Sequence, residues 1–310
     1  MGILSYLKGF RAVSIIGTGK ESGKTTTCNY ILSEAPEGLR LGVTSFGLGG
    51  VQTPLRIPRD SLVALAKNCE IANKLELLEE TNAHTPWGSV IIGRAKETLQ
   101  ATIAGPLCLK DLKEVRDKLS FLGCDLIIVD GVLNKKSLSS HRACDCFILA
   151  LGIDDFDQDL LWEEIQSQVE VLTIPVSTSI PPSFDKHYAL VQEKWIPFSM
   201  NEENLDLIRK AEEIFWPGAF TEKSLEFLEG WNSGLTVTVE EPWQIFLSVY
   251  NWRSLKQNGW VFKSCFQSPL VLVTLNAHSG SQFSLNPREC LDKVSQILSP
   301  LSVVDLKLNE

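Results

Sequence analysis

Basic residues are in the minority in this chain, which has 29 lysines and arginines against 38 aspartates and glutamates and a formal net charge of −9. Nucleic acids and anionic membrane surfaces attract proteins through clustered positive charge. The sequence contains no long run of lysines and arginines that would offset its acidic balance. The composition therefore argues against a general affinity for nucleic acid.

Long apolar runs are also missing, and no window is apolar for the length that spans a bilayer. Lys8 and Arg11 interrupt the mildly apolar start of the chain. Tyr6 stands where N-myristoylation usually needs serine or threonine. From these features we expect no membrane partner and a cytoplasmic location.

Cysteine occurs eight times, but never at the two-residue spacing typical of zinc sites and redox motifs. The closest pair, Cys144 and Cys146, has one residue between its members and no second pair to join. We therefore expect the thiols to be small apolar core residues rather than metal ligands.

A glycine-containing loop follows a short apolar run at 12–16 and precedes a segment that opens with Gly23-Lys24-Thr25. Glycines let successive backbone N–H groups surround an oxyanion, and a helix N-terminus adds a positive dipole. This order is typical of a phosphate-binding loop, or P-loop, whose lysine reaches the phosphates and whose threonine binds Mg²⁺. It predicts binding of ATP and Mg²⁺ by Gly17, Thr18, Gly19, Lys20, Glu21, Ser22, Gly23, Lys24, Thr25 and Thr26.

The strict P-loop pattern has a glycine five residues before Gly23, where this chain has Thr18. The same offset occurs in dethiobiotin synthetases, which the segment resembles in its Gly-Thr-x-x-x-x-Gly-Lys-Thr order. The alternative is a glycine-rich turn of a Rossmann-like sheet without a nucleotide. The guanine-recognition pattern Asn/Thr-Lys-x-Asp is absent from the sequence, which favours ATP only weakly over GTP.

A second informative stretch, 124–131, contains four apolar residues that end at Asp130. This is typical of a buried strand whose acid holds Mg²⁺ at the nucleotide, although many parallel strands end in an acid. Together with the P-loop it predicts Thr25 and Asp130 as Mg²⁺ ligands. Lys24, Lys20 and Asp130 are then the candidate catalytic groups, with a solvated loop lysine as the alternative for Lys20.

Apolar strand-like runs alternate with helical segments along the chain, which predicts an α/β P-loop NTPase fold with a doubly wound parallel sheet. The polar, proline-bearing segment 177–183 marks a boundary. We therefore predict a nucleotide-binding domain over 1–180 and a smaller α/β region for partner interaction over 181–310. The same patterns predict strands at 89–93, 146–152, 170–176 and 269–275 and helices at 61–69, 108–122, 203–215 and 286–298.

Several short motifs link these elements. They are Thr85-Pro86-Trp87-Gly88, Ala104-Gly105-Pro106, the run from Ile128 to Ser137, and Leu272-Val273-Thr274-Leu275-Asn276. Together with the loop, they resemble the P-loop subunit of lysine 5,6-aminomutase reactivases over most of the chain. The resemblance implies an ATP-driven chaperone that helps an adenosylcobalamin-dependent aminomutase to exchange damaged cobalamin.

One departure from that family concerns the loop after the second predicted strand, where its members usually carry an acid. This chain has Gly47-Leu48-Gly49-Gly50 there, which predicts slow hydrolysis. Two alternatives stay open: an ATP-dependent ligase or kinase acting on a small molecule, and a nucleotide-binding scaffold without turnover. The oligomeric state is also open, and in a homo-oligomer Lys20 would gain importance if a second subunit faced the site.

Overall fold

The computed structural model describes residues 2–19, 21–47, 54–131, 136–153, 160–201, 205–228, 234–277 and 286–308. The chain forms two compact units, the first made of Met1–Asp159 with Ser268–Glu310 and the second of Leu160–Gln267. This division differs from the single boundary predicted near residue 180. The composition of 177–183 is a local signal, and it cannot reveal that the last strands of the chain return to the first sheet.

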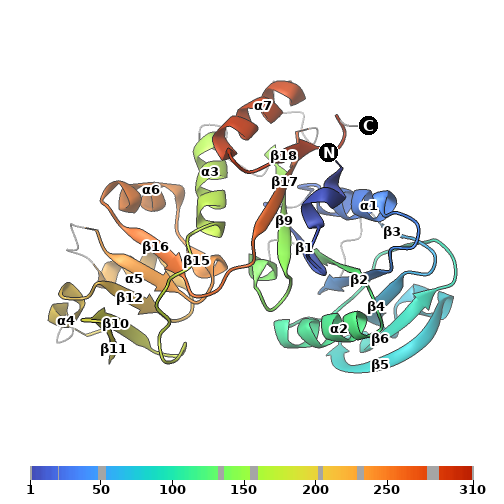
Figure 1. The fold of residues 1–310 in the computed structure, drawn as a ribbon, viewed down its shortest axis with the longest axis horizontal. Helices are drawn as coiled ribbons and strands as arrows, with labels where there is room; N and C mark the ends of the chain where they lie inside the picture. Colours follow the sequence, from blue (N-terminus) through green and yellow to red (C-terminus); the bar gives the residue numbers. More distant parts are fainter. Residues whose placement is uncertain are drawn as a thin grey trace. The chain divides into compact units, whose positions relative to one another are not determined.

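The first unit contains a nine-stranded mixed sheet, which confirms the prediction of an α/β fold (Figure 1). In spatial order its strands are β18 (Val303–Asp305), β17 (Leu270–Asn276), β9 (Cys146–Gly152), β1 (Ala12–Gly17), β8 (Leu126–Gly131), β2 (Leu41–Phe46), β4 (Leu62–Ala66), β6 (Gly88–Ala95) and β5 (Leu75–Thr85). Neighbours from β18 to β4 run parallel, whereas β4, β6 and β5 pair antiparallel. The carboxyl ends of the parallel strands therefore meet at one edge, where α/β proteins bind ligands.

Three helices accompany this sheet: α1 (Lys24–Glu34), α2 (Leu109–Phe121) and α7 (Pro287–Leu298). Helix α1 buries Cys28 and Ile31 against Val13 and Ile15 of β1, and in the view of Figure 1 it lies above the central strands while α2 lies below them. Shorter elements are β3 (Leu55–Ile57), β7 (Leu99–Ala101), η1 (Ile3–Leu7), η2 (Glu70–Lys74) and η3 (Lys136–Ser139). No helix within the described ranges is long and apolar enough to cross a membrane.

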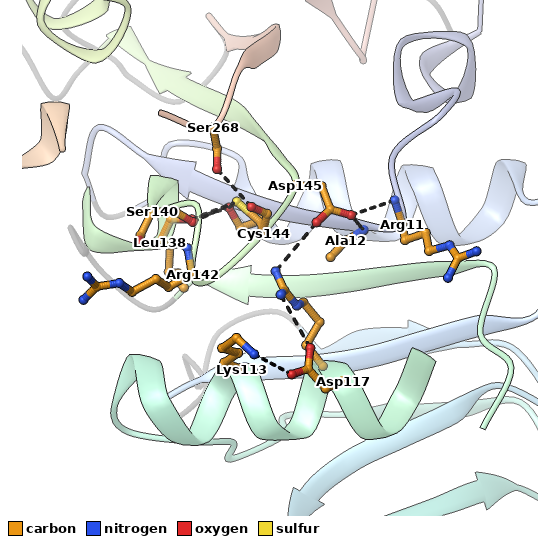
Figure 2. A network of polar contacts seen from close by, with 12 residues as sticks. Arg11, Ala12, Lys113, Asp117, Leu138, Ser140, Arg142, Cys144, Asp145 and Ser268 are labelled. Carbon is orange, nitrogen blue, oxygen red and sulfur yellow. Dashed lines mark hydrogen bonds and ion pairs between the residues drawn. The ribbon is translucent and has the colours of Figure 1, made fainter. Parts of the chain in front are cut away.

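Polar contacts fix the amino ends of the central strands. The Asp145 carboxylate accepts hydrogen bonds from the backbone N–H groups of Arg11 and Ala12, both at 2.9 Å (Figure 2). It also lies 3.7 Å from the guanidinium of Arg116 on α2. Nearby, the buried thiol of Cys144 contacts Ser14 Oγ at 3.1 Å. These contacts hold β1, β9 and α2 together at the edge opposite to the phosphate-binding loop.

The predicted core role of the cysteines is confirmed at six positions, where the residue is buried: Cys28, Cys124, Cys144, Cys146, Cys265 and Cys290. Cys69 is half-buried and Cys108 is exposed. Among the described residues, no three histidine, cysteine, aspartate or glutamate side chains are grouped so that they could hold a metal ion.

The second unit is built on a five-stranded sheet in the order β11 (Lys194–Phe198), β10 (His187–Val191), β12 (Glu213–Trp216), β14 (Thr236–Val239) and β16 (Val261–Ser264). Strands β12, β14 and β16 are parallel to each other, and β10 is antiparallel to both of its neighbours. An aromatic-rich core that includes Trp216, Phe220, Trp252, Trp260 and Phe262 packs on one face. The remaining elements are α3 (Leu161–Leu172), α4 (Leu205–Arg209), β13 (Phe220–Thr221), α5 (Glu222–Phe227), η6 (Pro242–Gln244), β15 (Ile245–Phe246) and α6 (Val249–Gln257).

Three predicted elements are wrong. The segment 61–69 is not a helix but contains strand β4, whose five residues are all buried. A short apolar run that is buried on every side has no period that separates helix from strand. The predicted strand at 170–176 begins inside α3, and the predicted helix at 203–215 is divided between α4 and β12. The strands predicted at 89–93, 146–152 and 269–275 and the helices at 108–122 and 286–298 are confirmed within one or two residues.

Candidate functional site: the loop between β1 and α1

The loop between β1 and α1 has the backbone that its glycines predict. Strand β1 is buried from Ala12 to Ile16, and α1 begins at Lys24. Glu21 and Gly23 both have positive φ angles, 66° and 98°. Left-handed residues in a loop turn neighbouring N–H groups toward a common centre, which makes a concave anion-binding surface. Lys20 lies outside the described residues.

Gly17 ends β1 at a position that has no room for a side chain. A Cβ atom there would lie 2.7 Å from Lys24 Nζ and would overlap Ser22 Oγ. The loop therefore folds closely over the end of the strand, and this close approach requires the glycine.

Thr18, which replaces the glycine of the strict pattern, fastens the loop to β9. Its backbone N–H donates to Ala150 O at 3.1 Å, and its Oγ1 accepts a hydrogen bond from Gly152 N at 3.0 Å. A threonine at this position thus adds an anchor that glycine lacks. The departure from the strict pattern has a structural reason and leaves the curvature of the loop intact.

Lys24 is half-buried and folds back over the loop that precedes it. Its Nζ donates hydrogen bonds to Gly19 O and, at 3.1 Å, to Ser22 Oγ. The ammonium group is therefore held at the concave side of the loop, where an oxyanion would replace these uncharged acceptors with a charged one. Charge-assisted hydrogen bonds are about twice as strong as neutral ones.

Asp130 lies on β8 directly beside β1, in register with Ile15. The residue is 8% exposed, and burial raises the pKa of its carboxyl group to about 6, although the Cys28 hydrogen bond and the Lys24 charge partly oppose the shift. The Cys28 thiol, whose own pKa is raised well above its usual value by burial, lies 3.6 Å from Asp130 Oδ1. A carboxylate with so weak a partner is a ready oxygen ligand for a hard cation such as Mg²⁺.

The three threonines that follow Lys24 have different surroundings. Thr25 is half-buried and Thr26 is exposed, whereas Thr27 is buried. Thr27 Oγ1 makes hydrogen bonds with Gly23 O at 3.0 Å and with Thr274 Oγ1 at 2.8 Å. Thr27 thus supports the start of α1, and the predicted ligand Thr25 is the threonine that directly follows the lysine.

Strand β17, far away in the sequence, also contacts the loop. Asn276 Nδ2 donates to Glu21 O at 2.8 Å, and a Cβ atom on Gly23 would lie 3.4 Å from Asn276 Cβ. A cavity of about 40 Å³ separates this part of the loop from the ends of β17 and β18. Asn276 is not among the predicted site residues, because no local pattern signals a contact across 255 positions.

Two hollows of very different volume lie near the loop. A wider depression of about 850 Å³ runs along the outer face of α1, from Thr26 to Pro36, and is bordered by Arg56 and Arg59. Of the predicted site residues, Thr26 alone lines it. We therefore assign the chemistry to the loop itself, which holds the Lys24 ammonium and adjoins the strand that carries Asp130, and regard the depression as a solvated groove.

A nucleotide polyphosphate with Mg²⁺ fits these residues on three observations. Glu21 and Gly23 have the left-handed backbone that occurs in anion-binding nests, Lys24 supplies a positive charge that folds back over the loop, and Asp130 supplies a buried anionic oxygen on the adjacent strand. The described site residues of the loop and the first turn of α1 form two runs, 17–19 and 21–26. Leu48 to Gly50, where an acid is missing, lie outside the described residues.

Comparison with known proteins shows no family for this chain. Comparisons with protein-family models, with curated proteins and with solved structures find no match.

Proposed function

We propose that this protein binds ATP with Mg²⁺ at the loop between β1 and α1 and uses the nucleotide to switch its grip on a partner enzyme. The observation that carries the proposal is the pairing of β8 with β1, which sets Asp130 beside Ile15, two residues before Gly17 at the start of the loop. A phosphate-binding loop and a metal-binding acid are useful to each other only when they are neighbours.

Within this proposal each residue has a separate role. The backbone N–H groups of Gly19 and of residues 21–25 surround the phosphates, Lys24 neutralises their charge, and Thr25 and Asp130 hold the metal. Bound Mg²⁺ would supply positive charge that offsets the charge on the phosphates. The Lys24 ammonium, which donates to Gly19 O and Ser22 Oγ, would donate to a phosphate oxygen instead, so the internal hydrogen bonds of the loop would differ with nucleotide bound.

The partner that we propose is an adenosylcobalamin-dependent aminomutase, with this protein as its reactivating chaperone. The support is the resemblance of the linking motifs, one of which lies at the same edge of the sheet. Gly105 N donates to Gly47 O at 2.9 Å, and Gly47 N donates to Pro106 O at 2.6 Å. The Ala104-Gly105-Pro106 motif therefore supports Gly47, the residue that directly follows β2.

Replacement of Lys24 tests the nucleotide site. We expect Lys24→Ala to weaken Mg²⁺–ATP binding about 10- to 100-fold, because it removes a charge-assisted hydrogen bond to phosphate. Isothermal titration calorimetry measures the affinity, and a parallel titration with GTP establishes base preference. Lys8→Ala is the matched control, since Lys8 is exposed and lies outside the loop. Equal affinities for the wild type and Lys24→Ala would contradict this assignment.

Recovery of an inactivated aminomutase tests the partner. The enzyme is first inactivated with bound hydroxocobalamin and then mixed with this protein, free adenosylcobalamin and Mg²⁺–ATP. We expect activity to return with the wild type and not with Lys24→Ala. Failure in every nucleotide state, despite measured ATP binding, would reject the chaperone role. Phosphate release that depends on an added small metabolite would instead support a ligase or kinase.

A further inference from the structure

Ser45, on β2, carries a buried hydroxyl group with no use in the described fold. Its relative exposure is 0%. Among the residues that the structure describes, its Oγ has no hydrogen-bond partner. Buried polar groups nearly always have a hydrogen-bond partner, so an unpaired one indicates that a partner such as a ligand or a water molecule is missing.

Other buried hydroxyl groups in the central strands are paired. Ser14 Oγ on β1 donates to Leu138 O at 2.7 Å. Thr44 Oγ1, one residue before Ser45 and on the opposite face of β2, donates to Ala64 O at 3.0 Å. The environment of Ser45 is therefore unlike that of its neighbours.

The register of the sheet places Ser45 beside the metal-binding acid. Ser45 pairs with Asp130 across the parallel strands β2 and β8, and Asp130 pairs with Ile15 on β1. Residues in register on neighbouring strands point to the same face of a sheet. Cys28 of α1 contacts Asp130 on that face, so the Ser45 hydroxyl and the Asp130 carboxylate share the α1 side at the edge that carries the loop.

The backbone at Ser45 is held firmly. A Cβ atom on Gly105 would overlap Ser45 O, which shows how closely the 104–106 segment crosses the end of β2. The hydrogen bonds of Gly47 with Gly105 and Pro106 fix this crossing. The backbone that carries the Ser45 hydroxyl group is therefore held in place at the end of β2. A residue that positions a ligand requires such a fixed backbone.

We propose that Ser45 is a positioning residue of the magnesium site, whose Oγ accepts a hydrogen bond from a water molecule bound to the metal that Asp130 and Thr25 hold. This inference rests on the proposed nucleotide function. Mg²⁺ in nucleotide sites keeps several of its waters, and each water needs acceptors around it. Loss of such an outer partner typically lowers metal affinity 10- to 100-fold.

Metal affinity in the presence of nucleotide tests the assignment. Ser45→Ala and the similar-sized Ser45→Cys are titrated with Mn²⁺ in the presence of ATP, with electron paramagnetic resonance as the readout. We expect both to bind the ion about 10- to 100-fold more weakly than the wild type. Binding of ATP in excess EDTA stays unchanged, and the urea midpoint of the free Ser45→Ala protein is no lower than that of the wild type.

Ser14→Ala is the matched control, because Ser14 is an equally buried serine that has protein partners. It lowers the urea midpoint and leaves Mn²⁺ affinity unchanged. Wild-type Mn²⁺ affinity in both Ser45 variants would overturn the proposal, as would a loss of stability like that of Ser14→Ala without a change in metal affinity. Absence of ATP binding by the wild type itself would reject the proposed function, and the role of Ser45 with it.

Discussion

Asp130→Asn is expected to make the free protein more stable at pH 8 while it abolishes Mg²⁺-dependent nucleotide binding. Burial raises the pKa of Asp130 from 3.8 to about 6. A shift of this size corresponds to about 3 kcal/mol, and a neutral asparagine avoids most of that penalty. A residue kept ionised in such surroundings is better explained by a bound cation than by folding.

The sign of the pH dependence follows from the raised pKa. The folded protein holds the Asp130 proton more tightly than the unfolded chain does, so the contribution of Asp130 to wild-type stability falls as pH rises from about 4 to about 6. Above pH 6 the full penalty applies. The advantage of Asp130→Asn therefore grows over this interval and is smallest below the unfolded pKa of 3.8, where the wild-type carboxyl is mostly protonated in both states.

Urea unfolding at pH 4, 6 and 8 measures this difference. Asp125→Asn is the matched control, since Asp125 precedes the same strand and hydrogen bonding to Arg40 N lowers its pKa. The Asp125 carboxylate stabilises the folded protein above its unfolded pKa, and this stabilisation is lost as pH falls. The trend is opposite to that of Asp130. Mg²⁺–ATP then raises the midpoint of the wild type and not of Asp130→Asn, because ligand stabilisation requires binding. An Asp130→Asn protein less stable than the wild type at pH 8 would contradict the argument.

Local chemistry made the centre of the first unit predictable. The P-loop pattern is one continuous segment that leads from a buried strand through glycines to Lys24, and the second pattern is a strand that ends one residue after Asp130. Both patterns could be recognised because each involves only neighbours in sequence. The carboxyl ends of parallel strands meet at one edge, which places the end of β2 at the same edge of the sheet as the loop after β1. What the sequence could not indicate is that the Ser45 hydroxyl group has no hydrogen-bond partner among the described residues, because that depends on the atoms that surround it.

Contacts between distant parts of the chain were the part that local patterns could not predict. Asn276 reaches Glu21 because β17 pairs with β9, which in turn pairs with β1. The run 62–66 became a strand because β2 and β6 offer it backbone partners on both sides. In each case the deciding hydrogen bonds come from segments far away in the sequence, whereas propensity and periodicity describe a single segment.

The second unit contains a buried charge whose removal is expected to have the largest effect on stability. Glu213, at the start of β12, accepts hydrogen bonds from Ser177 Oγ at 2.8 Å and Thr238 Oγ1 at 2.5 Å. Its other oxygen lies 2.9 Å from Lys263 Nζ on β16. The Glu213 side chain is 5% exposed and that of Lys263 is 30% exposed, so the pair is largely shielded from water.

Glu213→Ala is expected to lower the free energy of unfolding of this unit by about 3–5 kcal/mol, the range for breaking one partner of a buried ion pair. The replacement leaves the Lys263 ammonium and two buried hydroxyl groups without their acceptor. Seven of the eight tryptophans lie in Leu160–Gln267, so urea unfolding followed by tryptophan fluorescence reports mainly on this unit. Glu212→Ala, at the exposed neighbouring position, should stay within about 0.5 kcal/mol of the wild type.

Glu213→Gln separates the charge from the hydrogen bonds. Its amide oxygen still accepts from Ser177 and Thr238, whereas its amide nitrogen meets the Lys263 ammonium as a second donor. If the hydroxyl groups carry most of the stabilisation, Glu213→Gln loses much less than Glu213→Ala. If the ion pair carries it, the two variants lose similar amounts. We expect the first result, because Lys263 is exposed enough to turn its ammonium group toward water and the two hydroxyl groups are buried. A Glu213→Ala protein within 1 kcal/mol of the wild type would show that the network contributes little to folding.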